Sequence, residues 1–262
     1  ASLTDIFIMD AFGTAHRKQA STYGVAEFSS IACAGFLFAS ELEALEKVMT
    51  NTQSPMIAVV GGSKVSTKLS LLDSLSDKVD QLILGGGIAN TFLKAQGCEI
   101  GQSLYEPNFI PQAKKIISKL QARGASLPIL KDVVCGKQFD PNEPAVVKQI
   151  DQIMPDDMIF DLGPKSMKVI VAMVKSAKTI LWNGPLGVFE YSQFSQGTEL
   201  LAKSIAKSNG FSLAGGGDTI SAIQMFGVEK DISYISTAGG AFLEFVEGKK
   251  LPAIEILEAR AS

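Results

Sequence analysis

Short apolar segments alternate with longer amphipathic segments along most of the chain. The apolar segments are rich in Val, Ile and Leu, and several are apolar at successive positions rather than at every second one. Continuous apolar strands are typical of a parallel sheet that is covered on both faces. The pattern predicts strands over residues 6–10, 56–60, 81–85, 127–134, 158–163, 179–184, 211–215 and 232–237.

Segments with helical periodicity lie between most of these strands. The expected helices cover residues 64–77, 89–97, 108–122, 165–177, 191–208, 218–226 and 240–247. Alternation at this spacing predicts βαβ units, and therefore an α/β fold with a doubly wound, mostly parallel Rossmann-like sheet. A further amphipathic helix is expected over residues 34–50. It is either one more surface helix or a link between the main domain and an upstream segment.

Composition and charge narrow the function classes. The 262 residues are 46% hydrophobic and 19% charged with a net charge of −3, so no basic surface indicates nucleic acid. No apolar run approaches the roughly 20 residues of a membrane span. The three cysteines, Cys33, Cys98 and Cys135, form no CxxC pair, and His16 is the single histidine. We therefore expect a cytoplasmic protein without a disulfide framework, a zinc site or a histidine-based catalytic triad.

Glycine clusters follow several of the expected strands. They occur in "VVGGSKVSTK" (59–68), "LILGGGIANTF" (82–92), "LWNGPLGVFE" (181–190), "LAGGGDTISAIQMFG" (213–227) and "ISTAGGAF" (235–242). Glycine permits positive φ and a close approach of the backbone to a ligand. The helix that follows presents free N–H groups and the positive end of its dipole, which suits phosphate. Each cluster alone is explained by ordinary turn chemistry, but several at one sheet edge predict a phosphate and nucleotide site.

Polar residues near the glycines leave alternatives open. Asp218 caps a helix, binds Mg²⁺, or does both, since Mg²⁺ takes one or two carboxylates together with phosphate oxygens. Lys64 and Lys68, four residues apart, are expected on one helix face, either solvated or holding a polyphosphate. Glu190 either caps a turn or accepts a ribose hydroxyl. The Walker A, G-x-G-x-x-G and protein-kinase fingerprints are all absent. The residues alone thus indicate an α/β domain for a phosphorylated ligand such as an Mg-nucleotide.

Six motifs together resemble the phosphoglycerate kinase family, in its bacterial form. They are "DAFGTAHR" (10–17), "GGSKVSTK" (61–68), "GGGIANTF" (85–92), "WNGPLGVFE" (182–190), "GGGDT" (215–219) and "STAGGAFLE" (236–244). The resemblance spans essentially the whole chain. It implies reversible, Mg²⁺-dependent phosphoryl transfer between 1,3-bisphosphoglycerate and ADP, which gives 3-phosphoglycerate and ATP in glycolysis. It also implies two Rossmann-like domains that face each other across a cleft, and a monomeric full-length protein.

The same resemblance implies residue roles. Lys64 and Lys68 would contact the transferring phosphoryl group and the nucleotide phosphates, and Glu190 would bind the ribose. Asp218 would hold the metal, within a phosphate turn made of Gly215, Gly216, Gly217, Asp218 and Thr219. The adenine slot would be lined by Gly62, Gly87 and Val188. Gly239 and Gly240 would offer N–H groups near the transferred phosphate, and Arg17 would contact phosphoglycerate.

The chain also departs from the family pattern. An Asp-Phe-Asn-Val-Pro-type strand and a His-Leu-Gly-Arg-Pro-type loop occur nowhere in it. Residues 1–33 are therefore expected to be the remnant of a substrate domain, 34–50 a hinge helix, 51–248 the nucleotide-binding domain, and 249–262 a segment that packs back towards the first domain. We expect this chain to bind Mg-nucleotide and to turn over phosphoglycerate poorly, because most substrate positioning would be missing.

Two single positions also differ from the family pattern, and two other functions are compatible with the sequence. Met9 stands where many relatives have Asn. Ala238 replaces the first glycine of a common Thr-Gly-Gly-Gly run, and it would be strained if that position required positive φ. The alternatives to a phosphoglycerate kinase are a non-catalytic nucleotide-binding module and a different small-molecule kinase on an α/β sheet.

Overall fold

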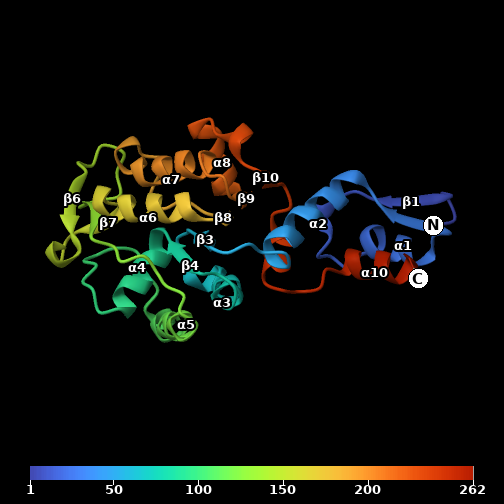
Figure 1. Cartoon of the computed structure of the whole chain (residues 1–262), viewed down its shortest axis with the longest axis horizontal. Helices are drawn as coiled ribbons and strands as arrows, with labels where there is room; N and C mark the ends of the chain where they lie inside the picture. The colour runs from blue at the N-terminus through green and yellow to red at the C-terminus, as the bar shows by residue number, and fades with distance from the viewer. Residues whose placement is uncertain (262) are drawn as a thin grey trace. The chain divides into compact units, whose positions relative to one another are not determined.

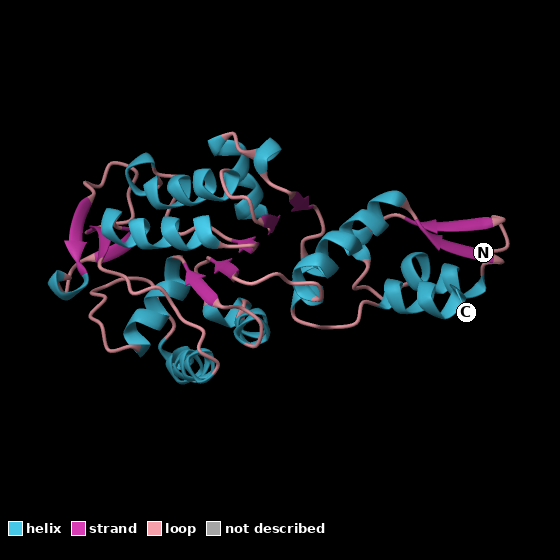
Figure 2. Cartoon of the chain, in the orientation of Figure 1, coloured by secondary structure: helices cyan, strands magenta, loops and turns pink. Residues whose placement is uncertain are grey.

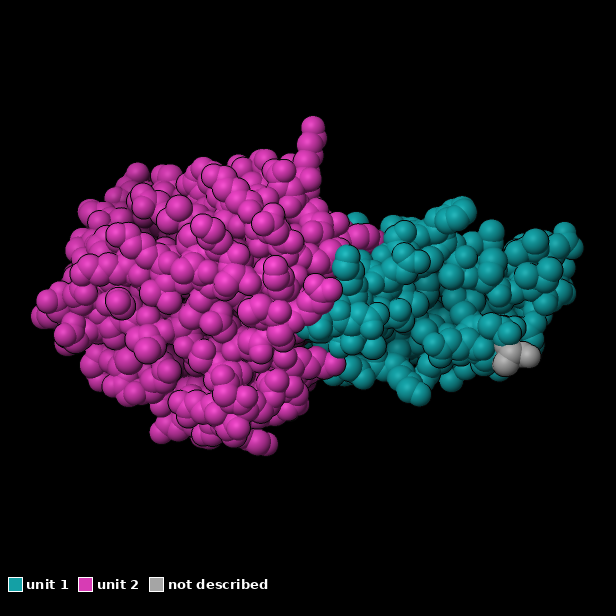
Figure 3. Space-filling view, viewed as in Figure 1, with its two compact units in different colours: residues 1–52, 236–262 teal, residues 53–235 magenta. Residues whose placement is uncertain are grey.

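The computed structural model describes residues 1–261 and divides the chain into two compact units (Figure 3). The terminal unit comprises residues 1–52 and 236–262, and the central unit comprises residues 53–235. The four expected ranges remain predictions of how the chain is divided into functional domains: 1–33, 34–50, 51–248 and 249–262. No helix within residues 1–261 has the length and apolar character needed to cross a membrane.

A five-stranded sheet with the order β10-β9-β8-β3-β4 forms the middle of the central unit (Figures 1 and 2). The neighbours β9–β8, β8–β3 and β3–β4 all pair in parallel. The bounds are β3 (Met56–Val60), β4 (Gln81–Leu84), β8 (Thr179–Asn183), β9 (Phe211–Gly215) and β10 (Tyr234–Ser236). The mostly parallel sheet expected from the continuous apolar segments is confirmed.

Helices cover both faces of this sheet. Figure 1 shows α3, α4 and α5 on one side of it and α6, α7 and α8 on the other. Their bounds are α3 (Leu69–Ser76), α4 (Gly86–Ala95), α5 (Ile110–Ala122), α6 (Pro164–Ser176), α7 (Gln196–Ala206) and α8 (Gly217–Phe226). Every residue of β3 and β8 is buried between the two helical layers, including Trp182 with no exposed surface. This double cover explains why both strands are apolar at nearly every position.

Short 3-10 helices connect several of these elements. They are η3 (Val65–Thr67), η4 (Pro107–Phe109), η5 (Ile150–Gln152), η6 (Ser192–Phe194) and η7 (Glu229–Asp231). Two of them shorten expected helices: α3 and α7 begin later than positions 64 and 191, because η3 and η6 precede them. Local backbone geometry, rather than apolar periodicity, decides where each α-helix starts.

A second sheet in the central unit corrects one expectation. The segments expected as strands over 127–134 and 158–163 form β5 (Asp132–Gly136) and β7 (Met158–Leu162), which pair antiparallel. A strand that was not expected, β6 (Val146–Gln149), pairs with the other edge of β5. Placing β5 and β7 in the parallel sheet was therefore wrong. A short apolar run does not encode the direction of its neighbour, which depends on the path of the connecting chain.

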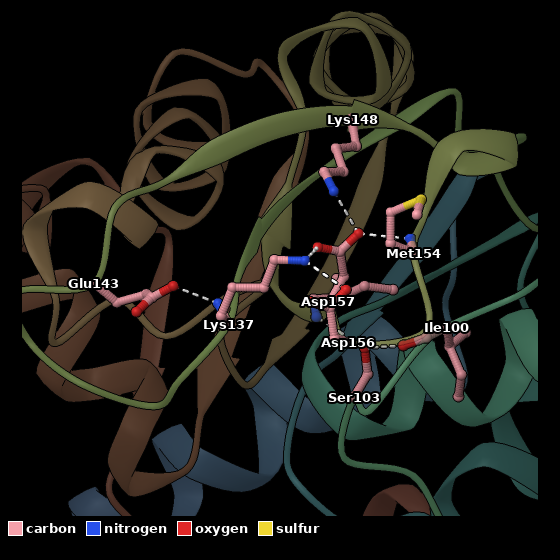
Figure 4. A network of polar contacts seen from close by, with 9 residues as sticks. Ile100, Ser103, Lys137, Glu143, Lys148, Met154, Asp156 and Asp157 are labelled. Carbon is pink, nitrogen blue, oxygen red and sulfur yellow. Dashed lines mark hydrogen bonds and ion pairs between the residues drawn. The ribbon is translucent and has the colours of Figure 1, made fainter.

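A polar network holds the start of β7 (Figure 4). The carboxylate of Asp157 is 1% exposed and pairs with Lys137 at 2.7 Å and Lys148 at 2.6 Å. It also accepts the backbone N–H of Met154 at 2.6 Å. The same lysine, Lys137, pairs with the exposed Asp156 at 2.6 Å. Burial would raise the pKa of Asp157, but the hydrogen bonds from both lysines and from Met154 outweigh it and lower that pKa to about 2.

The terminal unit contains a parallel pair of strands and helices from both ends of the chain. Its elements are β1 (Ile6–Met9), η1 (Phe12–Thr14), the π-helical turn η2 (Ala20–Gly24), α1 (Val25–Phe28), β2 (Ile31–Ala34), α2 (Phe36–Met49), α9 (Gly240–Val246) and α10 (Pro252–Ala261). The sequence pattern indicated neither β2 nor α10. Phe12 and Phe38 meet edge to face at 5.0 Å in its core. Arg260 of α10 donates to the carbonyl oxygen of Ser29 at 2.7 Å, which ties the end of the chain to its beginning.

Candidate functional site

Four glycine turns lie at one edge of the parallel sheet. Because β9, β8, β3 and β4 are parallel neighbours, their carboxyl ends share that edge. The turns that follow these strands contain the glycines at 215–217, at 184 and 187, at 61–62 and at 85–87, in that spatial order. Ligands of open α/β sheets bind at the carboxyl ends of the strands. The expectation that four turns meet at one edge is confirmed.

Several glycines let these turns pack against one another. A Cβ atom on Gly61 would lie 1.8 Å from the carbonyl oxygen of Pro185, and one on Gly85 would lie 2.3 Å from the same atom. A Cβ atom on Gly87 would lie 2.2 Å from the carbonyl oxygen of Ser63. These contacts are shorter than any side chain permits, so the turns after β3, β4 and β8 form one interlocked platform. Here the absence of Cβ permits contact between backbones, whereas the sequence indicated contact with a ligand.

Lys68 connects the two central strands of the platform. Its ammonium group donates to the carbonyl oxygen of Gly61 at 2.6 Å, just after β3, and to that of Asn183 at 3.2 Å, at the end of β8. Burial lowers the pKa of Lys68 to about 8, and the nearby charge of Asp218 opposes that shift. The ammonium group is therefore held at the carboxyl ends of both strands, partly desolvated, and within electrostatic range of a carboxylate.

The expected placement of Lys64 and Lys68 on one helix face is wrong. Lys64 is extended, with φ −133° and ψ 124°, and it precedes η3. Lys68, with φ −126° and ψ 13°, separates η3 from α3 and is not helical. Spacing of four residues aligns side chains only when the whole interval is α-helical. Lys64 is exposed, whereas Lys68 turns inward to the carbonyl oxygens.

A glutamate that the sequence did not single out holds the turn beside Lys64. Glu106 accepts the N–H of Ser66 at 2.8 Å and its hydroxyl at 2.7 Å. Desolvation alone would raise the pKa of Glu106, but these hydrogen bonds and the charge of Lys64 lower it overall. Glu106 lies 40 positions from its partner, so only the fold brings the two together.

Asp218 is a free carboxylate in the first turn of α8. The N-cap of α8 is Gly216, whose φ of 99° suits glycine, and no side chain caps the helix. Among residues 1–261 the exposed Asp218 carboxylate has no hydrogen bond or ion pair. The capping interpretation of Asp218 is therefore wrong. Gly217 at the start of the helix has nothing within 4 Å of its Cβ position, so the space beside Asp218 is open.

Hydrogen bonds of Thr219 and Asn183 hold the turn before α8 in place. Thr219 is 1% exposed, and its hydroxyl accepts the backbone N–H of Gly184 at 2.7 Å. Asn183 donates from its side-chain amide to the carbonyl oxygen of Gly215 at 2.7 Å. The buried Oδ1 of Asn183 has no hydrogen-bond partner among residues 1–261. Thr219 thus joins two turns. Asn183, which the sequence did not single out, bonds Lys68 through its backbone carbonyl and Gly215 through its side-chain amide.

An aromatic cluster borders the turn after β8. Val188 is half-buried, donates its N–H to the carbonyl oxygen of Phe160 at 2.8 Å and packs beside Phe160 and Tyr191. Phe139 is 62% exposed and lies 5.1 Å from the ring of Tyr191. Glu190, between Val188 and Tyr191, is exposed. Phe139 was missed, although an exposed aromatic residue in the polar stretch "GKQFDPNE" is a signal that a sequence can show.

Gly62 lies on the same platform as Gly87. Gly62 accepts the N–H of Ile88 through its carbonyl oxygen at 3.1 Å, so it sits beside the first turn of α4. The side chains of Ile88 and Lys68 lie 3.5 Å and 3.7 Å from its Cβ position. A small apolar surface and the ammonium group are thus adjacent at Gly62.

Arg17, Gly239 and Gly240 belong to the terminal unit. Gly239 has φ 48° and precedes α9, and a Cβ on Gly240 would lie 3.2 Å from Nε2 of His16. Arg17 is exposed. The buried Glu41 of α2 accepts the N–H and the hydroxyl of Thr237 at 2.9 Å and 3.0 Å, which anchors the glycine turn.

The question about Ala238 is answered by its backbone. No residue other than glycine has a positive φ within the part of the chain that the structure describes. Ala238 therefore has a negative φ and carries none of the strain that positive φ would cause. Its side chain is buried, at 2% exposure. The structure shows no reason for Met9, which is buried at the end of β1.

The larger hollows of the central unit lie away from the glycine turns. Two of them share Lys131, Val169 and Met173: one lies against α6, and the other lies between α5 and α6. We place the functional site at the turns instead, because the exposed carboxylate of Asp218, the partly desolvated ammonium group of Lys68 and the N-terminus of α8 come together there. No cluster of three or more metal-binding side chains occurs within residues 1–261.

Comparison with known proteins identifies relatives along the whole chain. The phosphoglycerate kinase family model matches residues 1–249. Phosphoglycerate kinases of Francisella tularensis are 57% identical (subsp. tularensis, strain WY96-3418) and 58% identical (subsp. novicida, strain U112) over 261 residues. The match covers 100% of this chain and 67% of each relative.

Solved structures agree with the sequence relatives. The structure of phosphoglycerate kinase from Coxiella burnetii has a TM-score of 0.97 at 54% identity and covers 100% of this chain and 67% of its own. The crystal structure of the enzyme from Pyrococcus horikoshii OT3 has a TM-score of 0.85 at 30% identity, over 99% of this chain and 65% of its own.

Proposed function

The chain belongs to the phosphoglycerate kinase family, and from this premise we propose that it binds Mg-ADP or Mg-ATP at the glycine turns of the central unit. The reaction that we propose transfers a phosphoryl group between 1,3-bisphosphoglycerate and ADP, giving 3-phosphoglycerate and ATP. Members of this family are phosphotransferases. A cytoplasmic location and a monomeric state are further parts of the proposal. The expected poor turnover by this chain stays a prediction.

The observation that carries the proposal is the pairing of Lys68 with the open turn at Asp218. Lys68 is anchored on the carbonyl oxygens of Gly61 and Asn183, and Asp218 has no partner within the described residues. A phosphate between them would receive a desolvated positive charge and the N-terminus of α8. These residues fit an Mg-nucleotide, because the exposed carboxylate of Asp218 would hold the metal at the N-terminus of α8.

The remaining residues have proposed roles around the same turns. Gly62, Gly87 and Val188 would border the base, with Phe139 as an exposed aromatic surface nearby. Glu190 would accept a ribose hydroxyl, and Lys64 would reach the transferring phosphoryl group from its exposed position. In the terminal unit, Gly239 and Gly240 would offer N–H groups to the phosphate and Arg17 would bind phosphoglycerate.

The proposed chemistry needs no nucleophile or general base from the protein. Phosphoryl transfer depends mainly on positioning and on charge stabilisation of the transferring group. Bound Mg²⁺ would supply part of that charge stabilisation. Lys68 and the backbone N–H groups at the start of α8 would supply the rest without rearrangement. Hydrogen bonds to Gly61 and Asn183 already hold Lys68, and those of Asn183 and Thr219 hold the turn before α8.

Titration calorimetry with ADP, in the presence and absence of Mg²⁺, tests the binding part of the proposal. Magnesium-dependent binding of ADP is expected, together with competition by ATP. A coupled assay with 3-phosphoglycerate and ATP then measures transfer. Binding without any transfer, even when an amino-terminal domain is supplied separately, would support the non-catalytic module, whereas absence of Mg-ADP binding by the folded chain would refute the proposed site.

A further inference from the structure

Asp161 is a buried acid beside the proposed site that the proposed chemistry does not use. It lies on β7 and is 1% exposed. Its Oδ2 atom accepts the backbone N–H of Gly197, in the first turn of α7, at 2.6 Å. Its Oδ1 atom is buried and has no hydrogen-bond partner within residues 1–261. A buried polar atom without a partner is uncommon and calls for an explanation.

The carboxyl group of Asp161 occupies space that two glycines leave free. A Cβ on Gly187 would lie 2.4 Å from Oδ1 of Asp161, and a Cβ on Gly197 would lie 2.2 Å from it. Gly187 belongs to the loop over residues 184–190, and Gly197 belongs to α7. The carboxyl group is therefore wedged between the loop and the helix, and neither glycine can change without displacing it.

The loop over residues 184–190 depends on this region for its position. The N–H of Val188 bonds to the carbonyl oxygen of Phe160, the residue before Asp161, at 2.8 Å. The N–H groups of Leu186 and Gly187 lie 3.1 Å and 3.3 Å from the buried hydroxyl of Thr198 in α7. The same loop carries Val188 and Glu190, which have proposed roles at the base and the ribose. A change at Asp161 would therefore act on a loop whose residues Val188 and Glu190 have proposed nucleotide contacts.

The surroundings of Asp161 contain no compensating charge. The residues that face it from the loop, from α7, from β5 and from α4 are Gly187, Gly197, Val134 and Asn90, none of which titrates. A small cavity lies beside it, bordered by Leu186 and by Gly86 and Asn90 of α4. Burial raises the pKa of Asp161 to about 7, although the hydrogen bond from the N–H group of Gly197 and the nearby N–H group of Leu162 oppose the shift.

We propose that Asp161 is a positioning residue for the nucleotide site: its protonated carboxyl group holds the loop over 184–190 against α7, and loss of the proton loosens the loop and weakens nucleotide binding. The inference rests on the proposed function. An ionised oxygen without a partner is costly in an apolar site. Movement of the loop, or entry of water into the adjacent cavity, relieves that cost. The lost proton passes to solvent, and acidification restores the tight form.

Calorimetric titration of the whole chain with Mg-ADP, from about pH 6 to about pH 8.5, compares the wild type with Asp161→Asn. Asn has the shape of the neutral acid and does not ionise. We expect equal dissociation constants at the acid end. At the alkaline end the wild type binds about fivefold more weakly than Asp161→Asn, near the lower limit for coupled sites. At each pH we take the ratio of the dissociation constants of the wild type and Asp161→Asn. Titration of ADP and of Lys68 affects both proteins equally and therefore cancels in this ratio. A ratio that stays constant with pH overturns the proposal.

Asp132→Asn is the matched control. Asp132 has no exposed surface and accepts the N–H groups of Lys165 and Ser166 at the start of α6, so it is also a buried acid at a helix N-terminus. None of its hydrogen bonds involves the 184–190 loop. We expect the ratio of wild type to Asp132→Asn to be independent of pH. The same pH dependence in both variants would mean that any buried carboxyl has this effect, which refutes a special role for Asp161.

Proton uptake gives a second readout that a merely structural role would not change. If nucleotide binds the protonated form more tightly, binding must raise the proton occupancy of Asp161. At about pH 7, the binding enthalpy in two buffers of different ionisation enthalpy should show more proton uptake by the wild type than by Asp161→Asn. Equal uptake contradicts the proposal. Asp161→Ser, which also cannot ionise, replaces Asp161→Asn if that variant does not fold.

Failure of this inference is distinguishable from failure of the proposed function. Tight Mg-ADP binding with a constant ratio removes the role of Asp161 and leaves the site in place. Absence of Mg-ADP binding at every pH, by a chain that unfolds cooperatively, refutes both.

Discussion

The ammonium nitrogen of Lys68 lies 2.6 Å from the carbonyl oxygen of Gly61, at the carboxyl end of β3. A second hydrogen bond, to the carbonyl oxygen of Asn183, fixes the same nitrogen at the end of β8. Lys68 therefore presents one positive charge at the point where two glycine turns meet. Because Lys68 is not helical, although the sequence predicted a helix over residues 64–77, its position depends on these carbonyl oxygens rather than on helical geometry.

Replacing Lys68 with methionine should weaken Mg-ADP binding while leaving the chain folded. A hydrogen bond to a charged group contributes about 1.5–3 kcal/mol, so the dissociation constant should rise by about 10- to 150-fold. Titration calorimetry measures the change. Lys114→Met, an exposed lysine in α5, is the control and should bind as the wild type does. Equal weakening in both variants would indicate loss of general positive charge rather than of this contact.

The pKa of Lys68, lowered to about 8, predicts opposite effects of pH on binding and on stability. Above about pH 8 the free protein loses the Lys68 proton, so Mg-ADP affinity should fall by at most about tenfold per pH unit. The unfolded chain keeps that proton up to its ordinary pKa of 10.5, so it binds more protons than the native state between these values. The free energy of unfolding should therefore rise with pH in this window, by at most about 1.4 kcal/mol per unit.

Denaturant titrations of the wild type and Lys68→Met at several pH values measure the stability part of that prediction. The difference between the two proteins isolates Lys68 from the other lysines. Stability that falls with pH for the wild type relative to Lys68→Met would show that the folded-state pKa is raised instead.

Replacing Asp218 with alanine should abolish the magnesium-dependent stabilisation of the chain by ADP. Ligand at about 100 times its dissociation constant adds about 2.7 kcal/mol, or roughly 5–10 °C in midpoint for a domain of this size. Thermal unfolding with and without Mg-ADP should show this shift for the wild type and not for Asp218→Ala. Asp231→Ala, an exposed acid in η7, should retain the shift. A magnesium-dependent shift in Asp218→Ala would place the metal elsewhere.

Two glycines of the site should respond differently to alanine. In Gly87→Ala the new methyl group would lie 2.2 Å from the carbonyl oxygen of Ser63, and such overpacking costs about 1–3 kcal/mol. In Gly217→Ala the methyl group enters open space, so the free energy of unfolding should change by less than about 0.5 kcal/mol. Urea unfolding distinguishes the two.

Nucleotide binding completes the comparison of these glycines. Gly217→Ala should weaken Mg-ADP binding in spite of its normal stability, because the methyl group stands where the phosphate would approach. Unchanged affinity in Gly217→Ala would show that the ligand does not approach this turn.

The network around Asp157 predicts acid sensitivity of the second sheet. Its pKa of about 2 is below the ordinary value of 3.8, so its stabilising contribution is complete above about pH 4 and is lost as pH falls towards 2. The contribution is about 2 kcal/mol, and Asp157→Asn should remove it. The difference in unfolding free energy between wild type and Asp157→Asn should shrink on acidification from pH 7, as denaturant titrations can measure. A difference independent of pH would contradict the ion pairs with Lys137 and Lys148.

The sequence by itself determined the features that depend on neighbouring residues. The continuous apolar runs of β3 and β8 identify strands covered on both faces, and each glycine cluster marks the end of a strand. Since parallel neighbours share one edge, the site at residues 61–62, 85–87 and 215–219 followed from these two local signals. The motifs then indicated the family.

Only the tertiary structure decided the features that depend on distant residues. The non-helical backbone of Lys68 follows from carbonyl oxygens on two strands, one of them 115 positions away at Asn183. The antiparallel pairing of β5 and β7 depends on the path of the chain between them. Asp161 is an ordinary acid in the sequence, and it becomes a buried one because a loop and a helix close around it. Periodicity and turn chemistry are local, whereas strand direction, burial and pKa arise from contacts that form only when the chain is folded.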